Sequence, residues 1–194
     1  MNGLTEYRER YPTLYTAPHS NESPNSICLT CSPHTLSRLI HVGLGLHKWN
    51  TALVTTLEST FHAANQIDFD LSGWDISKTT TLSQTFKDAN RFAGKGLDSW
   101  GSTASVTNLY RTFYKASSMN ADLTRWDVSR VISLQDTFYG AKEMNGDMSG
   151  WHTTKVANLH DAFRDMPKFA GELRCGVLQL VLSLHVCLAC TFPT

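Results

Sequence analysis

Apolar residues recur along the chain at a nearly constant interval, in an order shared by all copies. Five tryptophans mark the copies, and their spacing is even to within one residue. They are Trp49, Trp74, Trp100, Trp126 and Trp151. Periods of roughly 20 to 50 residues are typical of proteins whose copies stack, because no single copy can bury its apolar face alone.

A second apolar pattern in each copy predicts a short helix. A leucine stands four residues before a phenylalanine, and an alanine or methionine follows three residues later. The pairs are Leu57 and Phe61, Leu82 and Phe86, Leu109 and Phe113, Leu134 and Phe138, and Leu159 and Phe163. Spacings of three and four residues trace one face of a helix, so we expect helices over about 130–142 and its equivalents. Ser77, Ser129 and Thr154 suit the capping of these helices.

The tryptophan half of each copy predicts a short strand. It has the form Leu-x-x-Trp, with an apolar residue two positions further on in two copies, as in Leu71 to Ile76 and Leu123 to Val128. This matches the leading half of the leucine-rich-repeat strand, with an indole in the second leucine place. The predicted fold class is therefore α/β: a leucine-rich-repeat-like right-handed solenoid with one short parallel strand and one short helix in each of about five repeats.

The third copy is longer than the others by one residue on each side of Trp100. Gly94, Gly96 and Gly101 lie beside the extra residues. We expect local loops or bulges there that leave the buried positions in register.

Two unlike ends flank the predicted repeat domain, which covers residues 45–173. Residues 1–44 are rich in Ser, Asn and Pro, and we expect them to be largely loose. Residues 174–194 are apolar, and Leu178 to Leu188 alternate as in a half-buried strand that caps the open end of the stack. A tail translated past a mispredicted gene boundary and a membrane segment over Cys175 to Phe192 are the alternatives.

Charge and composition narrow the function classes. The 17 basic and 17 acidic residues cancel, and no Lys/Arg cluster stands out, which argues against nucleic acid as a partner. A membrane partner is also not expected. The stretch from Met1 to Arg10 carries four charged residues and lacks the apolar run of a secretory signal.

Two metal hypotheses arise from the sequence, although the prediction is that the protein needs no metal or cofactor. Cys28 and Cys31 form one C-x-x-C pair, and Cys187 and Cys190 form another. A four-sulfur zinc site would require the two chain ends to meet across the whole stack. The second hypothesis concerns acidic residues that recur with the repeat. They are Asp70, Asp75, Asp122, Asp127 and Asp147. They either form turns by bonding their own backbone or line up as a calcium ladder.

Asp68, Asn120 and Asn145 occupy equivalent places in three copies. We expect them to form an inward ladder that bonds backbone amides of adjacent turns. No phosphate-binding loop, zinc-protease motif or nucleophile elbow occurs, and candidate acids and bases are copied with the repeat. The chain is therefore predicted not to be an enzyme.

The candidate binding face consists of the residues between each strand leucine and its tryptophan. These are small and polar, apart from Arg125. The predicted face comprises Ser72, Asp98, Ser99, Thr124, Arg125 and Ser149. Repeat proteins commonly bind partners on such an outward surface.

The unit F-x-x-A-x-x-M-N-x-D-L-x-x-W-D-V-S-x-V-x-x-L-x-x-x-F stands complete from Phe113 to Phe138. It resembles the 25-to-26-residue repeat of the BspA-like leucine-rich-repeat surface proteins, which include mycoplasma and listeria surface lipoproteins. The resemblance covers about two thirds of the chain. It implies a cell-surface or secreted module for adhesion or protein interaction, without enzymatic activity. The partner expected on the outward face is a protein or glycan of unknown identity.

Overall fold

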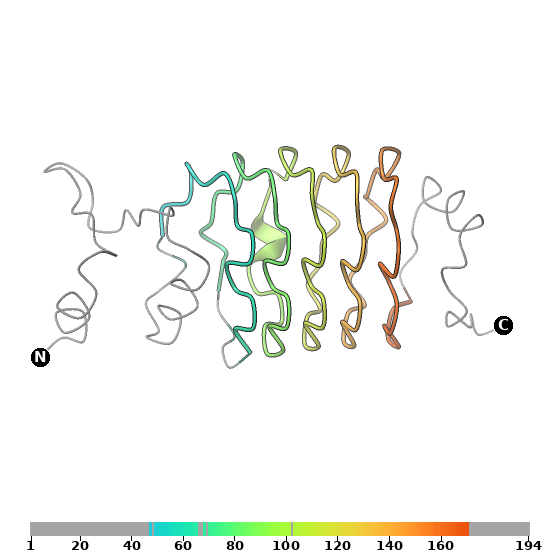
Figure 1. The fold of residues 1–194 in the computed structure, drawn as a ribbon. Coiled ribbons are helices and arrows are strands. Elements are labelled where there is room, and N and C mark those ends of the chain that lie inside the picture. The colour runs from blue at the N-terminus through green and yellow to red at the C-terminus, as the bar shows by residue number, and fades with distance from the viewer. Residues whose placement is uncertain (1–46, 48, 66–67, 69, 102, 171–194) are drawn as a thin grey trace, which may run out of the picture.

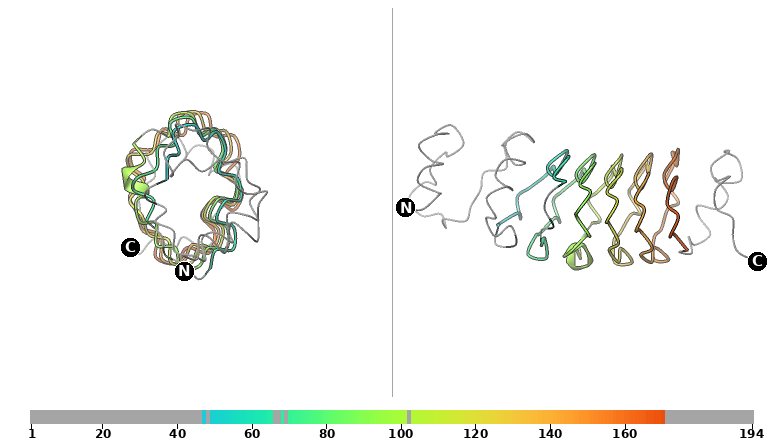
Figure 2. Two further views of the ribbon diagram at one scale, coloured as in Figure 1. Left: turned by 90° about the vertical axis from the view of Figure 1, so that its left-hand side faces the viewer. Right: turned by 90° about the horizontal axis from the view of Figure 1, so that it is seen from below.

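Each copy of the repeat makes one circuit of the chain, and the circuits stack side by side along one axis (Figure 1). The computed structural model describes residues 47, 49–65, 68, 70–101 and 103–170. Viewed along the axis, successive circuits follow nearly the same path (Figure 2). We number the circuits 1 to 5 by the leucine that precedes each phenylalanine: Leu57, Leu82, Leu109, Leu134 and Leu159.

The predicted α/β leucine-rich-repeat-like solenoid is wrong. The only helix that lies wholly within the described residues is the 3₁₀ helix η3 (Leu97–Ser99), and no sheet forms among them. Single parallel bridges join neighbouring circuits instead of strands. They are Thr56 to Thr81, Thr81 to Asn108, Asn108 to Ser133 and Ser133 to Asn158. These bridges fall within the segments predicted to be helical, and the segments predicted to be strands contain turns.

Left-handed residues prevent the predicted helices from forming. The second and sixth residues after each leucine have φ between 50° and 70°. They are Ser59, Ala63, Gln84, Asp88, Arg111, Lys115, Asp136, Gly140, Asp161 and Asp165. A left-handed residue interrupts a right-handed helix, so the chain forms successive tight turns, such as the one closed by Thr60 N and Leu57 O at 3.1 Å. We call this side of the stack the paired-turn side. Ser77, Ser129 and Thr154 therefore cap no helix.

Alternate amides on the paired-turn side bond the next circuit. From circuit 1, the N–H groups of Leu57, Ser59, Phe61 and Ala63 donate to carbonyls of circuit 2 at 2.7 to 3.2 Å. Circuits 2 and 4 repeat the arrangement with four amides each, and circuit 3 repeats it with three. Two successive tight turns separate each leucine from the phenylalanine four residues later, and both side chains therefore point inward. The four-residue spacing of a helix face thus arises here without a helix.

The opposite half of each circuit holds the tryptophans. Trp74 N donates to Leu71 O at 3.0 Å, and the same turn closes Leu123 to Trp126 and Met148 to Trp151. The turn directs leucine and tryptophan into the core and leaves the two residues between them outside. Each of the last three indoles also donates its N–H to the leucine carbonyl of the circuit before. The bonds are Trp100 Nε1 to Leu71 O, Trp126 Nε1 to Leu97 O and Trp151 Nε1 to Leu123 O, at 2.9 to 3.2 Å.

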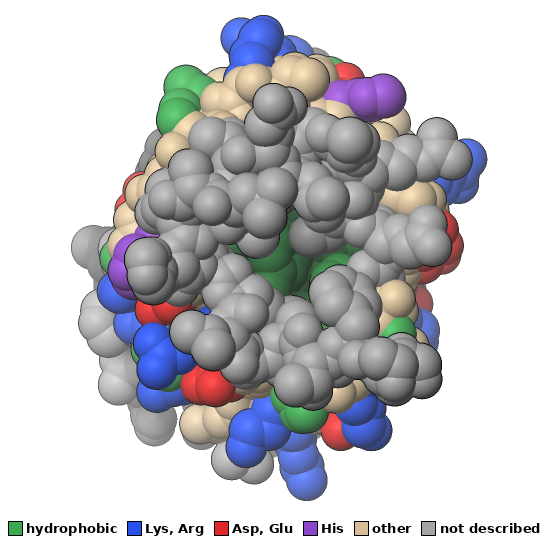
Figure 3. Space-filling view, turned by 90° about the vertical axis from the view of Figure 1, so that its right-hand side faces the viewer, with side chains coloured by type: hydrophobic (Ala, Val, Ile, Leu, Met, Phe, Trp, Pro, Cys, Tyr) green, Lys and Arg blue, Asp and Glu red, His purple; other side chains and the backbone are tan. Residues whose placement is uncertain are grey.

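The core is a column of stacked rings. The centroids of Phe61 and Phe86, Phe86 and Phe113, and Phe113 and Phe138 are each 5.4 Å apart, with nearly parallel planes. The five tryptophans are buried around this column. In the end-on view of Figure 3, hydrophobic side chains lie at the centre and charged side chains at the rim. Burial of these rings is the main source of stability.

The third copy behaves as the sequence predicts. Gly94 and Gly96 have φ of 95° and 90°, and η3 takes up the added length. The Trp100 and Trp126 rings remain stacked at 5.7 Å. A Cβ on Gly96 would lie 2.2 Å from Ser72 N, so the loop packs directly on the circuit before. The extra residues are accommodated outside a core that stays in register.

The predicted domain boundaries at residues 45 and 173 stay predictions, and both ends of the chain lie outside the described residues. The loose N-terminal segment, the strand cap and the membrane segment over Cys175 to Phe192 fall there. Within the described part, no helix is long and apolar enough to cross a bilayer.

Candidate functional site

The six residues of the predicted binding face lie on one edge of the stack, which we call the turn ridge. Ser72, Asp98, Ser99 and Arg125 are exposed, and Thr124 and Ser149 are half-buried. Neighbouring turns touch: Ser99 Oγ lies 3.0 Å from Ser72 O, and a Cβ on Gly150 would lie 2.6 Å from Thr124 O. The structure therefore brings the predicted residues into one row, on turns instead of strands.

Hydroxyl groups on the turn ridge are engaged within their own turns. Thr124 Oγ1 donates to Asp122 Oδ1, Ser149 Oγ donates to Asp147 Oδ2 at 3.1 Å, and Ser99 Oγ lies 2.6 Å from Gly96 O. Arg125 makes no ion pair with any described residue. The cation is thus the most available group on the ridge, while the hydroxyls hold the turns.

The repeated aspartates form turns, as one of the two sequence hypotheses states. Asp70, Asp75, Asp122 and Asp127 each accept a bond from the backbone N–H two residues ahead at 2.9 Å, and Asp147 does so at 2.7 Å. Bonds from that residue's amide and then its hydroxyl lower the pKa of Asp70 and Asp75. For Asp122 and Asp127 the hydroxyl lowers the pKa more than the amide does. A calcium ladder is not supported, because these carboxylates belong to no group of three clustered ligands in the described part.

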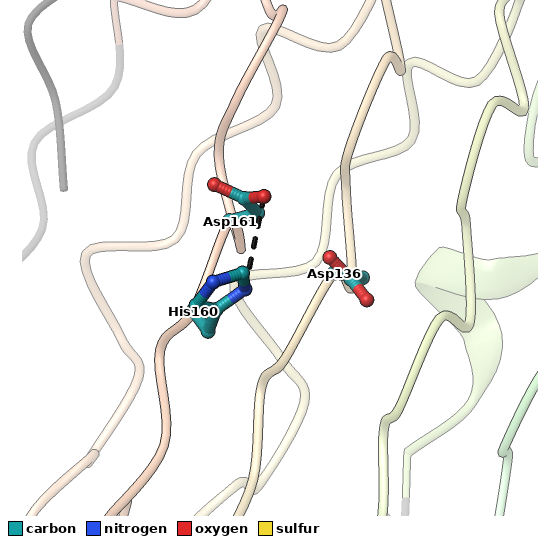
Figure 4. Close-up of side chains that lie close together, drawn as sticks. All are labelled: Asp136, His160 and Asp161. Carbon is teal, nitrogen blue, oxygen red and sulfur yellow. Dashed lines mark ion pairs between the residues drawn. The ribbon is translucent and has the colours of Figure 1, made fainter.

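One cluster of potential metal ligands does occur among the described residues. Side-chain atoms of Asp136, His160 and Asp161 lie within 4.8 Å of one another (Figure 4). Arg111 Nε lies 3.0 Å from Asp136 Oδ2, and Arg164 NH1 lies 3.3 Å from Asp161 Oδ2. Both carboxylates are therefore already paired with guanidinium groups, Asp136 with Arg111 of the circuit before and Asp161 with Arg164 of its own circuit.

The asparagine ladder is confirmed in its bonding but not in its direction. Asn120 Oδ1 accepts from Asn145 N, and Asn145 Oδ1 accepts from Ala170 N, both at 2.9 Å. Asp68 Oδ1 accepts from Ala93 N at 3.3 Å. All three acceptors bond a backbone amide of the next circuit, yet they are exposed and do not point inward. The zinc hypothesis concerns cysteines outside the described residues.

Sequence reasoning misses a row of buried threonines. Thr85 Oγ1 lies 2.9 Å from Leu57 O and 2.8 Å from Leu82 O, and Thr112 and Thr137 repeat the arrangement. Their hydroxyls satisfy carbonyls inside the stack. The recurrent dipeptide Thr-Phe is the signal that could have found them, because a hydroxyl next to a core phenylalanine needs a buried partner.

A cluster of aromatic and cationic side chains on the paired-turn side is also missed. Tyr114 stacks on Tyr139 with centroids 4.9 Å apart. The Arg111 guanidinium lies 4.8 Å from the Tyr110 centroid and 5.3 Å from that of Tyr114, and Arg164 lies 5.6 Å from that of Tyr139. We call these five residues the tyrosine cluster. They come from three circuits, and no helix or strand periodicity brings them together.

Comparison with known proteins identifies one family. The model of the family described as "Mycoplasma protein of unknown function, DUF285" matches residues 40–103 and 94–175. No curated protein and no solved structure matches the chain. The two matched segments together span more than half of the chain and contain all five tryptophans.

Proposed function

The chain belongs to the DUF285 family of Mycoplasma proteins of unknown function and is a repeat module, and we propose that it is non-catalytic and binds a protein partner. The repeat pattern resembles that of BspA-like surface proteins, which favours an adhesion role at the cell surface. The repeated aspartates support a non-catalytic module, because their carboxylates are engaged in closing turns.

The tyrosine cluster is the observation that carries the proposal. Tyrosine and arginine are enriched among the residues that dominate binding energy at protein interfaces. Tyr110, Tyr114 and Tyr139 are half-buried, so each exposes part of its side chain to solvent. Stacking and the neighbouring guanidinium groups fix the rings in place. Binding therefore costs little additional side-chain entropy.

A protein partner fits this cluster better than a glycan. Sugars stack on open ring faces, whereas Tyr114 and Tyr139 cover one another and cations cover further ring surface. The exposed parts of the tyrosine and arginine side chains suit the mixed apolar and polar contacts of a protein interface. The turn ridge, with Arg125 as its cation, is the second surface from which a partner could be bound.

Binding measurements on both surfaces test the proposal. Purified chain is titrated by biolayer interferometry against a panel of purified extracellular proteins and against an array of defined glycans. A Tyr114→Ser/Tyr139→Ser variant should lose at least about 30-fold in affinity for its protein ligand, as expected for removal of dominant contacts. Lys78→Ala is the control, because Lys78 is an exposed cation that belongs to neither surface.

Three outcomes contradict parts of this proposal. If the tyrosine variant binds with unchanged affinity and Arg125→Glu loses affinity, the turn ridge is the binding surface instead of the tyrosine cluster. Saturable binding to glycans alone would exclude a protein partner. Absence of saturable binding to any panel member would favour a structural spacer. Melting temperatures of the variants separate lost contacts from lost folding.

A further inference from the structure

Arg111 in the tyrosine cluster is anchored by a buried carboxylate. Its Nε lies 3.0 Å from Asp136 Oδ2, and the Asp136 side chain is 7% exposed, against 35% for that of Arg111. Within the described part, the guanidinium donates its hydrogen bond through Nε alone. A guanidinium carries five N–H donors in a planar fork, and its terminal pair matches the two oxygens of a carboxylate. Arg111 is therefore held at Nε while its two terminal nitrogens remain available to another acceptor.

Asp136 is itself fixed by neighbouring circuits. Gln135 Nε2 lies 3.4 Å from the same Oδ2 atom, and Asn158 Nδ2 donates to Gln135 Oε1 at 3.0 Å. The backbone supports the pair as well, because Arg111 N donates to Gln135 O at 3.1 Å and Asp136 N donates to His160 O at 2.8 Å. A chain of side-chain bonds thus runs from circuit 5 through circuit 4 to Arg111 in circuit 3. The stack sets the orientation of this guanidinium.

Two tyrosine rings flank the same guanidinium. Its central carbon lies 4.8 Å from the Tyr110 centroid and 5.3 Å from the Tyr114 centroid. An arginine confined between aromatic rings and a buried carboxylate has little rotamer freedom left to lose on binding. The fork is therefore preorganised for an acceptor that approaches from solvent.

The charges beside Tyr114 favour an acidic acceptor. Lys115 Nζ lies 5.2 Å from the Tyr114 centroid and forms no ion pair with any described residue. Other cations on this side have acidic partners: Lys87 with Asp88, Arg111 with Asp136, and Arg164 with Asp161. Asp165, two circuits beyond Lys115, is engaged by a hydrogen bond with Tyr139. An acidic group on a partner would thus complement the positive charge of Lys115 next to the fork.

We propose that Arg111 is the specificity-determining residue of the tyrosine cluster and that Asp136 is its positioning residue. The terminal nitrogens of Arg111 bind the carboxylate of an Asp or Glu side chain in an acidic segment of the partner protein, and Lys115 adds attraction. This inference rests on the proposed function and deepens it by naming the chemistry that the cluster recognises.

NMR titration of the whole isotope-labelled chain with hexaglutamate tests the fork, with hexaglutamine as the matched neutral peptide. Only hexaglutamate should shift the signals of the tyrosine cluster saturably, including Arg111 Nε–H. Arg111→Lys keeps the charge but removes the fork, and should weaken hexaglutamate binding at least about tenfold. Arg125→Lys is the control, because it makes the same change at an exposed arginine of the turn ridge and should leave binding unchanged.

Asp136→Ser tests the positioning role, because charge and geometry predict opposite results. Ser59 occupies the equivalent place in circuit 1 with the same left-handed backbone, so serine is compatible with the turn. Loss of a negative charge beside Arg111 would strengthen a merely electrostatic attraction to hexaglutamate. Loss of positioning should instead weaken binding about tenfold and shift the Arg111 Nε–H signal of the free protein. Backbone amide spectra establish whether the variant is folded, and Arg111→Lys decides the proposal if it is not.

Four outcomes would overturn the proposal. They are equal affinity for hexaglutamate and hexaglutamine, unchanged binding in Arg111→Lys, tighter binding in folded Asp136→Ser, and equal losses in Arg111→Lys and Arg125→Lys. A heparin hexasaccharide that binds more tightly than hexaglutamate, with the same dependence on Arg111, would also overturn it and assign the fork to sulfate groups of a glycan. A panel protein that needs the tyrosines but binds Arg111→Lys normally would leave the proposed function intact and remove this inference alone.

Discussion

The two long sides of the stack hold their register in different ways. On the paired-turn side, amides bond the next circuit at every second residue, and left-handed residues recur at the same two positions in every copy. On the turn ridge, each circuit is held by one tight turn and, in the last three, by an indole bond. Copy 3 has its extra residues beside Trp100, on the ridge. The paired-turn side thus sets the register, and the ridge tolerates change.

Insertion of a single glycine should show the largest difference in stability between the paired-turn side and the turn ridge. A glycine inserted between Tyr110 and Arg111 would displace the three N–H groups of circuit 3 that donate to carbonyls of circuit 4. It would also turn the Phe113 side chain away from the core. The cost should be at least about 4 kcal/mol, from lost hydrogen bonds and burial. The same insertion between Thr124 and Arg125 should cost only about 1 to 2 kcal/mol, as a lengthened loop does. Urea unfolding of both variants measures the difference, and equal losses would contradict the comparison.

Removal of one indole should cost nearly as much. Trp126 is 2% exposed, stacks on Trp100 and donates to Leu97 O at 3.0 Å. Trp126→Ala should lower the free energy of unfolding by about 3 to 5 kcal/mol, with loss of protection in circuits 3 and 4 together. Lys142→Ala, at an exposed position, should change it by less than about 0.5 kcal/mol. A loss for Trp126→Ala no larger than that of the lysine control would show that the ring column does not hold the circuits together.

The sequence predicts which residues are buried better than it predicts the backbone that buries them. The tryptophan and phenylalanine columns, the tolerated insertion at Trp100 and the turn-forming aspartates all follow from spacing and residue type. The helices fail because a spacing of four residues fits both a helix face and two successive tight turns. Nothing in Leu-x-x-x-Phe distinguishes these over so few residues, since Ser59, Gln84 and Arg111 are ordinary residues in left-handed geometry.

Of the two candidate binding surfaces, one could be predicted from the sequence and the other could not. The turn ridge could be predicted because its residues stand between two buried ones in every copy. The tyrosine cluster could not, because it depends on Tyr110, Arg111 and Tyr114 facing outward from consecutive turns. A helix over the same segment would have distributed these side chains around its circumference. The surface was missed because the backbone was predicted incorrectly.

An alanine with left-handed backbone geometry allows a test with a smaller expected effect, in which the substitution should increase stability. Ala63 is exposed and has a φ of 56°, which is unfavourable for any residue with a Cβ. Ala63→Gly should raise the free energy of unfolding by about 0.5 to 1 kcal/mol, because relief of strain exceeds the added freedom of the unfolded chain. Ala157 is also exposed but has no positive φ. Ala157→Gly should therefore lower stability by a similar amount, and destabilisation by both changes would refute left-handed turns.

Acid should act chiefly through the turn aspartates near the ridge. In Asp75, bonds from the amide and hydroxyl of Ser77 hold the pKa below its ordinary value; in Asp127, the hydroxyl and amide of Ser129 do the same. A carboxyl group with a lowered pKa in the folded state stabilises the fold above its unfolded pKa. That contribution is lost as pH falls through the folded value, below about pH 4.

Asparagine can keep the turn while it removes the titration. Asn50, Asn108 and Asn158 already accept the same bond from an amide two residues ahead. An Asp75→Asn/Asp127→Asn variant should therefore match the wild type near pH 7 and lose less stability as pH falls below about 4, as measured by thermal unfolding. On the paired-turn side, Asp161→Asn should instead weaken the pair with Arg164 near neutral pH. If the double variant kept the full acid sensitivity, the turn aspartates would not be its source, and the ion pairs of the paired-turn side would be the groups to examine.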